Sequence, residues 1–406
     1  MSALPAPLSG ITVLDLTRVL AGPLCGAILG DLGAEVVKVE HPSRGDDTRH
    51  WGLRIGKTET TYYNSINRNK KSLALDLGHD AGQAVATAIA ATSDILIENF
   101  KAGGADKLGL GYEKLSSLNE GLIYLSISGY DAKGEEASRL GYDLVIQGEA
   151  GLMAMNGEKD QPPLKFGTAI VDMFTGMHAA QAIMAALIER SRTGKGRHIQ
   201  LALFDCGLML TAYAGLEALL TREEPLRYGN GHSSIVPYGV FDTMDGPIVL
   251  TVGNEAQYAR FCESVIGRPD LATDPRFTSN RLRSENRAEL LPLLQDALST
   301  QRRADLLVRL AANGIPCGEV LKLGEALTSD RATSSGVITL HSHPDAGDVH
   351  VLASPYRFDG ERCPVRLRPP ILGEHSEEIL RDRLARTPQE IEKLIDDAVI
   401  RSATPR

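Results

Sequence analysis

Apolar runs of strand length alternate with helix-forming segments through the first half of the chain. The strand-length runs lie at residues 11–16, 36–42, 72–77, 94–100, 121–130 and 199–204. Segments rich in alanine, leucine and glycine follow most of them and have the length of helices. This alternation predicts an α/β fold with a mostly parallel, doubly wound sheet. In such a sheet, ligands bind outside the carboxyl ends of the strands.

The pattern changes near Thr221. Turn residues, short paired strands and a hairpin at Asp245-Gly246 precede helical segments at about 255–266, 284–299 and 303–313. Strand-like segments return after Gly336, and a charged stretch at 375–400 is predicted to be one helix. Because 406 residues exceed one compact core, we expect residues 1–220 to form a large domain. We expect residues 221–335 to form a smaller α+β domain and residues 336–406 to return to the large one.

Composition excludes several classes of partner. The net charge of −9 argues against nucleic acid. The five cysteines are scattered and fit neither a disulfide framework nor a zinc site. His341, His343 and His350 lie among turn residues, which favours a surface hairpin over a metal site. We therefore expect no metal.

The turn after the first strand lacks the G-x-G-x-x-G pattern, so we expect no nicotinamide or flavin. The first ten residues lack the basic and apolar regions of a signal peptide. The apolar run at 20–34 is too short to span a bilayer and contains Asp31. These features predict a cytoplasmic protein without a membrane partner.

Two places face the predicted ligand crevice. Asn99 and Phe100 end a predicted strand, and Asp172 precedes a long apolar helix in which no other acidic residue occurs before Glu189. A carboxylate at a helix start is favoured by the helix dipole, which keeps it ionised and suits a nucleophile. The alternative is that Asp172 is only an N-cap. The residues alone therefore indicate a soluble α/β enzyme with a crevice near these side chains.

Several segments together carry a more specific pattern, and they resemble the class III coenzyme A transferases, the family of formyl-CoA transferase and carnitine CoA-transferase. The match runs in order from about Leu8 to Leu380. The segments are LSGITVLDLTRVLAGPLCGAILGDLGAEVVKVEHP, GDDTR, NRNKKSLALDL, ILIENFKAGGADKLGLGY, GYDLVIQGEAGLM, RTGKGRHIQLALFD, GNGHSSIVPYGVF, NGIPCGEV and PPILGEHSEEIL.

The resemblance implies a fold, a reaction and an assembly. The fold is a large Rossmann-like domain, built from both ends of the chain, plus a smaller middle domain, and the assembly is an interlocked homodimer. The reaction moves CoA from an acyl-CoA to a small carboxylic acid, with coenzyme A as cosubstrate. Asp172 matches the aspartate that attacks the thioester and carries a covalent aspartyl intermediate.

The resemblance also implies CoA contacts. The positions involved are Leu20, Ala21, His41, Leu75, Asn99, Phe100, Lys101, Lys107, Arg139 and Asp143. Leu20, His41 and Gly78 depart from the glutamine, arginine and lysine of formyl-CoA transferase. Phosphate contacts are therefore expected to shift to Lys101, Arg139 or the Lys70-Lys71 pair. Asp143 matches an acidic residue near the nucleophile, and helix capping is its alternative role.

Two alternatives stay open. The α-methylacyl-CoA racemases resemble this chain, but they carry Gly-His-Asp where it has Gly141-Tyr142-Asp143. A tyrosine, with a pKa near 10, is a poor substitute for an imidazole at neutral pH. A non-catalytic acyl-CoA binding protein would not need Asp172.

We expect succinyl-CoA or a similar donor, and a small dicarboxylate acceptor such as itaconate, malate, citramalate or glutarate. Overall similarity to the dicarboxylate members of the family favours these substrates. Three cations, Arg18, Lys165 and Arg227, are candidates to hold the distal carboxylate of the acceptor.

Overall fold

A computed structural model describes residues 6–403, which gather into two compact units. The first unit contains the chain up to Leu152, then Phe166–Ala212, then the chain from Asp330 onwards. The second unit contains Met153–Lys165 and Tyr213–Ser329. The predicted domain division at 220/221 and 335/336 stays a prediction.

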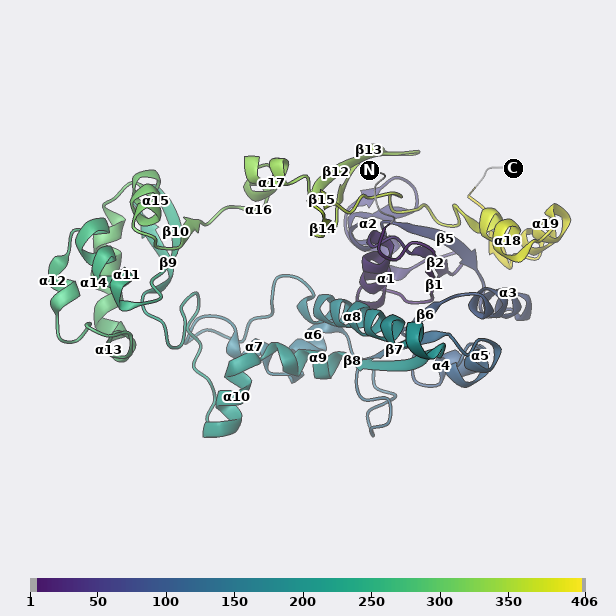
Figure 1. The fold of residues 1–406 in the computed structure, drawn as a ribbon, viewed down its shortest axis with the longest axis horizontal. Coiled ribbons are helices and arrows are strands. Elements are labelled where there is room, and N and C mark those ends of the chain that lie inside the picture. The colour runs from purple at the N-terminus through teal and green to yellow at the C-terminus, as the bar shows by residue number, and fades with distance from the viewer. Residues whose placement is uncertain (1–5, 404–406) are drawn as a thin grey trace. The chain divides into compact units, whose positions relative to one another are not determined.

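The first unit is built on a seven-stranded sheet, in the order β16-β5-β2-β1-β6-β7-β8 (Figure 1). Six of these strands run parallel, and only β16 is antiparallel to its neighbour β5. If the six parallel strands are numbered as they follow one another in the chain, their order across the sheet is 3-2-1-4-5-6. This is the doubly wound arrangement. The predicted α/β class and parallel sheet are confirmed. The strands are β1 (Thr12–Asp15), β2 (Glu35–Glu40), β5 (Lys70–Leu75), β6 (Ile95–Glu98), β7 (Ile123–Ser128), β8 (Arg197–Ala202) and β16 (Ile400–Arg401).

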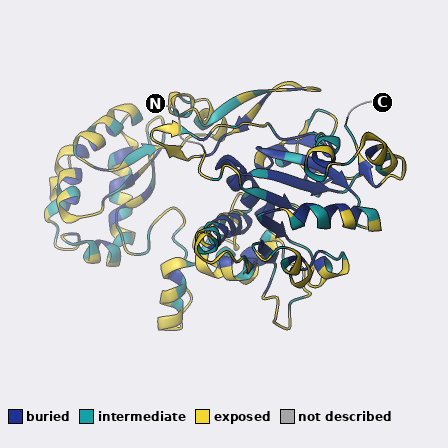
Figure 2. Cartoon of the chain, turned by 45° about the vertical axis from the view of Figure 1, so that its right-hand side comes forward, coloured by how far each residue is buried: buried dark blue, intermediate teal, exposed yellow. Residues whose placement is uncertain are grey.

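Helices cover both faces of this sheet, and the strands between them are buried along most of their length (Figure 2). On one face, Val13, Ile97 and Leu125 pack with α1 (Ala21–Asp31) and α8 (Ile170–Thr193), next to α6 (Asp143–Glu149) and α9 (Leu203–Leu210). On the other face, Leu14 and Leu73 pack with four helices. These are α3 (Asp80–Ala91), α5 (Tyr112–Leu118), α18 (Ser376–Leu384) and α19 (Pro388–Asp396).

Glycine lets α1 lie very close to its neighbours. A Cβ atom at Gly26 would lie 2.8 Å from Oδ2 of Asp15, at the end of β1. A Cβ atom at Gly176 of α8 would lie 2.6 Å from the carbonyl oxygen of Ala21. The two helices therefore meet at the carboxyl end of β1, which brings the start of α8 to the ligand edge of the sheet.

The helix predicted at 375–400 is wrong, because the chain forms two helices and a short strand there. Ala385 ends α18 in the left-handed conformation, with φ of 50°. Thr387 then starts α19 with a capping box, in which its hydroxyl and the Glu390 carboxylate each accept a backbone N–H, and Pro388 occupies the first turn. These local stop and start signals outweigh the continuous charge pattern.

The remaining elements of the first unit are short, and they surround the sheet. A helical turn, η1 (Asp47–His50), and α2 (Thr61–Ile66) follow β2, and α4 (Gly104–Lys107) follows β6. The unit also contains α17 (Asp330–Ser335) and three hairpins: β3 (Arg54–Ile55) with β4 (Glu59–Thr60), β12 (Ile338–His343) with β13 (Gly347–Leu352), and β14 (Arg357–Phe358) with β15 (Glu361–Arg362). The prediction that His343 lies at a surface is wrong: its Nε2 lies 3.1 Å from Oε2 of Glu59, and both side chains are fully buried.

The second unit is built on a three-stranded antiparallel sheet in the order β11-β10-β9. The strands are β9 (Tyr238–Thr243), β10 (Gly246–Thr251) and β11 (Cys317–Glu319). Helical segments pack on this sheet around Phe261, Phe277 and Leu294. They are α11 (Glu255–Arg260), η2 (Phe261–Val265), α12 (Pro269–Thr273), α13 (Asn280–Glu285), α14 (Arg287–Ser299) and α15 (Arg303–Ala312).

Helix α8 alone among the residues described is long and apolar enough to cross a membrane, with a mean hydropathy of 1.3. Helices α9 and α10 (Ala212–Thr221), bent by 82°, pass the same test as a pair. Core helices of globular proteins pass this test as well. In this structure Val171, Ala179 and Ile183 of α8 are buried in the core beside α1.

Candidate active site

The point where the strand order reverses lies between β1 and β6, because β1 pairs with β2 on one side and with β6 on the other. The chain leaves both strands at their carboxyl ends, through residues 18–21 and 99–102. These residues line a cavity of about 350 Å³, which we call the nucleophile cavity because Asp172 also lines it. Its position agrees with the general rule for open α/β sheets.

The loop after β1 is held in a strained conformation. Val19, a β-branched residue, has φ of 71°. The Asn99 side chain accepts the Arg18 N–H at 2.9 Å and donates to the Arg18 carbonyl oxygen at 2.8 Å. The Val19 N–H points to Oδ1 of Asp46 at 3.3 Å. These contacts hold the loop against the cavity, so the Asn99 amide has a structural partner there.

Asp172 is the third residue of α8, whose N-cap is Ala169. Asp172 is therefore not the N-cap, and its side chain, 8% exposed, makes no hydrogen bond within residues 6–403. Burial, and then the nearby Asp143 carboxylate, raise the pKa of Asp172 to about 7. The prediction that the helix start keeps this carboxylate ionised is wrong in direction, because burial disfavours the charged form and raises the pKa.

Asp143 lies at the start of α6, beside the start of α8. Its Oδ1 accepts the N–H groups of Val171 at 2.8 Å and Asp172 at 3.2 Å. Its Oδ2 accepts from Nε2 of Gln147 at 2.6 Å. Asp143 does not line the nucleophile cavity. The geometry therefore matches helix capping, which the sequence analysis gave as the alternative role of Asp143. The helix that Asp143 caps is α8, not its own helix α6.

Several predicted CoA contacts line the nucleophile cavity with Asp172. They are Leu20, Ala21, Asn99, Phe100, Lys101 and Arg139. The Arg139 guanidinium is paired with Glu136 and Glu149, which neutralise it. Lys101 is exposed and forms no ion pair with any described residue.

A second cavity of about 230 Å³, which we call the loop cavity, meets the nucleophile cavity at Arg18 and Phe100. The predicted contacts His41 and Leu75 line it, as does Gly78. Lys107 is exposed on α4 and lines neither cavity.

The Lys70-Lys71 pair, expected as an alternative phosphate contact, is not available. Lys70 is fully buried, and its Nζ donates to Asp15 at 3.0 Å and to the Pro23 carbonyl oxygen at 2.7 Å. Burial lowers the pKa of Lys70 to about 8 despite this partner. Lys71 is paired with Glu35 and Glu378. The prediction is wrong for Lys70, which is buried against Asp15 of β1, and Lys71 is already engaged by Glu35 of β2 and Glu378 of α18.

Two neighbours of the site were missed by sequence reasoning. Arg44 is exposed and lines the loop cavity. Burial, and then the charges of Asp172 and Asp143, raise the pKa of Tyr62 to about 12. The Tyr62 phenol therefore lies within electrostatic reach of Asp172. The matched segment GDDTR pointed to the loop near Arg44, whereas no sequence signal pointed to Tyr62.

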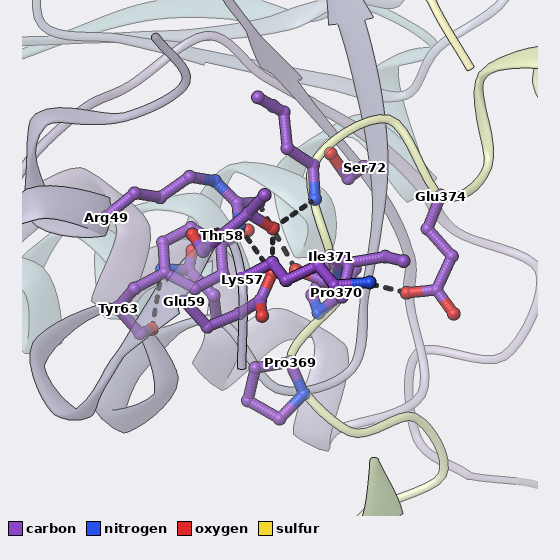
Figure 3. Close-up of polar contacts among 12 residues, drawn as sticks. Arg49, Lys57, Thr58, Glu59, Tyr63, Ser72, Pro369, Pro370, Ile371 and Glu374 are labelled. Carbon is purple, nitrogen blue, oxygen red and sulfur yellow. Dashed lines mark hydrogen bonds and ion pairs between the residues drawn. The ribbon is translucent and has the colours of Figure 1, made fainter. Parts of the chain in front are cut away.

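A buried charge cluster fixes the loop that carries Arg44. Arg49 forms two hydrogen bonds of 2.7 Å with Glu40 and stacks over the ring of Tyr63. Figure 3 shows Arg49 close to Glu59 and Tyr63, and a hydrogen bond of 3.2 Å joins its Nη2 to the Pro370 carbonyl oxygen. Burial alone would raise the pKa of Glu40, but Arg49, with help from Lys38 and Ser72, outweighs it and lowers the pKa to about 2.

The site offers no ligands for a metal. Among residues 6–403 there is no group of three or more His, Cys, Asp or Glu side chains that could hold an ion. The lining of the nucleophile cavity contains Tyr142 but no histidine within the described chain. The chemistry of this cavity is therefore that of two carboxylates, Asp47 and Asp172, with backbone groups, a phenol and three cations.

Comparison with known proteins gives consistent matches over nearly the whole chain. The model for CoA-transferase family III matches residues 8–376. The chain is 38% identical to succinyl-CoA:glutarate CoA-transferase from Mus musculus over 394 residues, which covers 97% of this chain and 90% of the relative. It is 38% identical to succinate–glutarate CoA-transferase from Agrobacterium fabrum over 382 residues, which covers 92% of this chain and 95% of that protein.

A solved structure gives the same picture. The crystal structure of a CAIB/BAIF family protein from Brucella suis superposes with a TM-score of 0.83 at 38% identity. The superposition covers 94% of this chain and 100% of the other.

Proposed function

The chain belongs to CoA-transferase family III and is an enzyme of the transferase class, and we propose that it moves CoA from succinyl-CoA to a small dicarboxylic acid through covalent intermediates on Asp172. The observation that carries this proposal is the Asp172 carboxylate, which lines the nucleophile cavity and has no hydrogen bond or ion pair with a described residue. A desolvated carboxylate with a pKa of about 7 is a better nucleophile than an exposed one.

Four acyl transfers complete the reaction. An Asp172 oxygen attacks the thioester carbonyl and expels CoA thiolate, which leaves a mixed anhydride. The thiolate then attacks the Asp172 carbonyl, releases succinate and forms an aspartyl-CoA thioester. The acceptor carboxylate attacks this thioester and regenerates thiolate and a second anhydride. Finally, the thiolate attacks the acceptor carbonyl, which forms the new acyl-CoA and frees Asp172.

Each step passes through an oxyanion that needs N–H donors. The Ala21 N–H is the candidate donor, because Ala21 lines the nucleophile cavity at the first position of α1. N–H groups in the first turn of a helix have no partner within that helix. The positive end of the α1 dipole adds to the stabilisation of the negative charge.

The two cavities divide the CoA molecule between them. The thioester lies in the nucleophile cavity and the nucleotide end in the loop cavity, with Phe100 between them. Arg18 lines both cavities, and its contact with Asp47 is long, at 3.8 Å. Arg18, Arg44 and Lys101 are therefore the cations proposed to hold the CoA phosphates, in place of Lys70, Lys71 and the neutralised Arg139.

The names of the relatives support the proposed substrate pair. The matched enzymes from Mus musculus and Agrobacterium fabrum are named for succinate or succinyl-CoA and glutarate. Of the three cations expected at the distal carboxylate, Lys165 and Arg227 belong to the second compact unit, and Arg18, which lines the cavity of Asp172, is assigned above to a CoA phosphate. Glutarate is the proposed first acceptor to test.

The test is mass spectrometry of CoA thioesters after incubation in D2O with succinyl-CoA, 2-methylacyl-CoA and a panel of acids: glutarate, itaconate, malate, citramalate, oxalate and carnitine. The expected result is a new thioester of one dicarboxylate, absent with Asp172→Ala. Deuterium at the α-carbon of 2-methylacyl-CoA without any new thioester would show a racemase and contradict the proposal. Unchanged transfer by Asp172→Ala would contradict the covalent mechanism.

The expected homodimer is proposed as well. On the first unit, α8 exposes Met173, Met177 and Ile188, and the neighbouring α6 and α9 expose Leu144 and Met209. Apolar side chains gathered on adjacent helices mark an interaction surface, and a second copy of the chain is the proposed partner. Light scattering should give twice the mass of the chain, and a monomer at micromolar concentration would contradict the proposal.

The proposed compartment is the cytoplasm. All five cysteines are free, and four of them are buried, as expected where thiols stay reduced.

A further inference from the structure

Helix α8 begins without a cap of its own. Its N-cap, Ala169, has a methyl side chain that cannot accept a hydrogen bond. An N-cap side chain ordinarily accepts the N–H groups of the second and third helical residues. In α8 these residues are Val171 and Asp172, and Oδ1 of Asp143 accepts both of them from α6. The cap is therefore supplied by a neighbouring helix.

We propose that Asp143 is the positioning residue of the nucleophile: it occupies the free N–H groups at the start of α8 and so leaves the Asp172 carboxylate unbonded in the nucleophile cavity. The inference rests on the proposed role of Asp172. Short acidic side chains near a helix start readily bond to the local N–H groups. With Asp143 in place, those donors are filled, and the Asp172 carboxylate keeps its lone pairs for the thioester.

Asp143 is itself held rigidly. Gln147, which is 1% exposed, donates its Nε2 to Asp143 at 2.6 Å and accepts the Phe166 N–H on its Oε1 at 2.8 Å. Asp143 also begins α6, since Tyr142 is the N-cap of that helix. Hydrogen bonds thus hold its carboxylate between α6 and α8.

Asp143 has a second effect on Asp172, through its charge. A carboxylate beside a carboxylate makes ionisation harder, and Asp143 follows burial as the cause of the raised pKa of Asp172. Cations and titratable groups also face this region from the other elements around it. They are Arg18 after β1, Asp47 of η1, Tyr62 of α2, Lys101 after β6, and Arg139 and Tyr142 before α6.

The test uses three variants and a pH profile. Asp143→Asn keeps an oxygen for the two N–H groups of α8 but removes the charge. Its amide nitrogen then faces Nε2 of Gln147, and because both are donors this hydrogen bond is lost. The double variant Asp143→Asn with Gln147→Glu keeps every hydrogen bond and the net charge, while it moves the charge one side chain away from α8. Asp143→Ala removes the cap altogether. Melting temperatures identify the folded variants, and kcat and KM for succinyl-CoA are measured from pH 5 to 9.

The expected result differs among the variants. In the double variant, the apparent pKa of the acid limb of the kcat profile should shift to lower pH by about one unit. Asp143→Ala should lower kcat by about 10- to 100-fold while KM stays within about twofold. Wild-type kcat and an unshifted acid limb in the folded variants would overturn the proposal. A raised KM with unchanged kcat would overturn it too, because Asp143 would then be a CoA contact.

Failure of the proposed function itself looks different. In that case the wild-type protein would form no covalent species at Asp172 with succinyl-CoA. Trapping such a species in the wild type, together with unshifted profiles in the variants, would remove only the role of Asp143.

Discussion

Glu40 and Asp172 are both buried carboxyl groups of the first unit, 4% and 8% exposed, and their surroundings are opposite. Glu40 accepts hydrogen bonds from Arg49, from Tyr63 and Ser72, and from a backbone N–H. Asp172 accepts none among the residues described. The pKa of Glu40 is lowered to about 2, and that of Asp172 is raised to about 7.

The difference separates a structural carboxylate from a reactive one. The free energy of ionising Glu40 is offset by Arg49, so this group stabilises the fold above its unfolded pKa of about 4.5, and the stabilisation is lost as pH falls toward 2. No hydrogen bond or ion pair from a described residue offsets the cost of ionising Asp172, so the fold loses stability as pH rises from about 4 to about 7. Burial alone therefore does not set Asp172 apart from Glu40, and the missing partner is what makes Asp172 the proposed nucleophile.

The largest expected effect is on turnover. Asp172→Asn should lower kcat at least about 10³-fold, since no other described carboxylate lines the cavity except Asp47, which faces Arg18. Steady-state rates with succinyl-CoA and glutarate measure this. Asp296→Asn, exposed on α14 of the second unit, is the matched control and should keep the wild-type rate. A rate above one tenth of wild type in Asp172→Asn would break the distinction between the two carboxylates.

The next largest effect is on stability and concerns the buried ion pair between Glu40 and Arg49. Arg49→Met should lower the free energy of unfolding by about 3–5 kcal/mol, because Glu40 would be left buried without its cation. Urea unfolding measures the loss. Arg381→Met, which removes an exposed pair with Asp382, should change it by less than about 0.5 kcal/mol. Equal losses in the two variants would show that Glu40 does not depend on Arg49.

Substitution of the unpaired carboxylate, Asp172, should raise the free energy of unfolding instead of lowering it. Asp172→Asn removes the cost of ionisation and should raise the free energy of unfolding by about 2–4 kcal/mol at pH 8, and by less at pH 5. The gain should grow as pH rises toward 7 and then level off. Urea unfolding at both pH values is the measurement. A variant that is less stable than wild type at pH 8 would mean that Asp172 has a partner after all.

The smallest effect concerns the cations. Arg18→Ala and Arg44→Ala should each raise KM for succinyl-CoA by about 3- to 10-fold, because a charge-assisted phosphate contact is lost at an exposed site. Lys71→Ala is the control, since Lys71 is already paired with Glu35 and Glu378. If Lys71→Ala raised KM more than Arg44→Ala did, the result would support the phosphate contact at Lys71 that was predicted from the sequence, and would contradict the one proposed at Arg44.

The sequence was sufficient for the sheet, because hydrophobic period and segment length are local properties. Each of the six predicted parallel strands exists, shifted by a few residues, and the predicted crevice coincides with the turn after β1. The C-terminal helix was mispredicted because the signals at Ala385 and Thr387 are short and the charge pattern is long.

The site was only partly predictable, because ion pairing is a property of the fold. In the sequence, Lys70 and Lys71 cannot be told from an exposed basic pair, yet the fold buries Lys70 beside Asp15. Asp143 could be placed near Asp172 by resemblance, but its bonds to the start of α8 depend on how α6 packs against α8. The direction of the Asp172 pKa shift follows from burial, which the sequence does not contain.

The most direct test of the central claim, that the unpaired Asp172 carboxylate is the nucleophile, is to locate the covalent intermediate. The protein is mixed with succinyl-CoA, treated with hydroxylamine at fixed pH and digested, and the peptides are sequenced by mass spectrometry. The account predicts a hydroxamate on Asp172 in the wild type and none in Asp172→Asn. A hydroxamate on another residue, or turnover in the wild type without any hydroxamate, would contradict it.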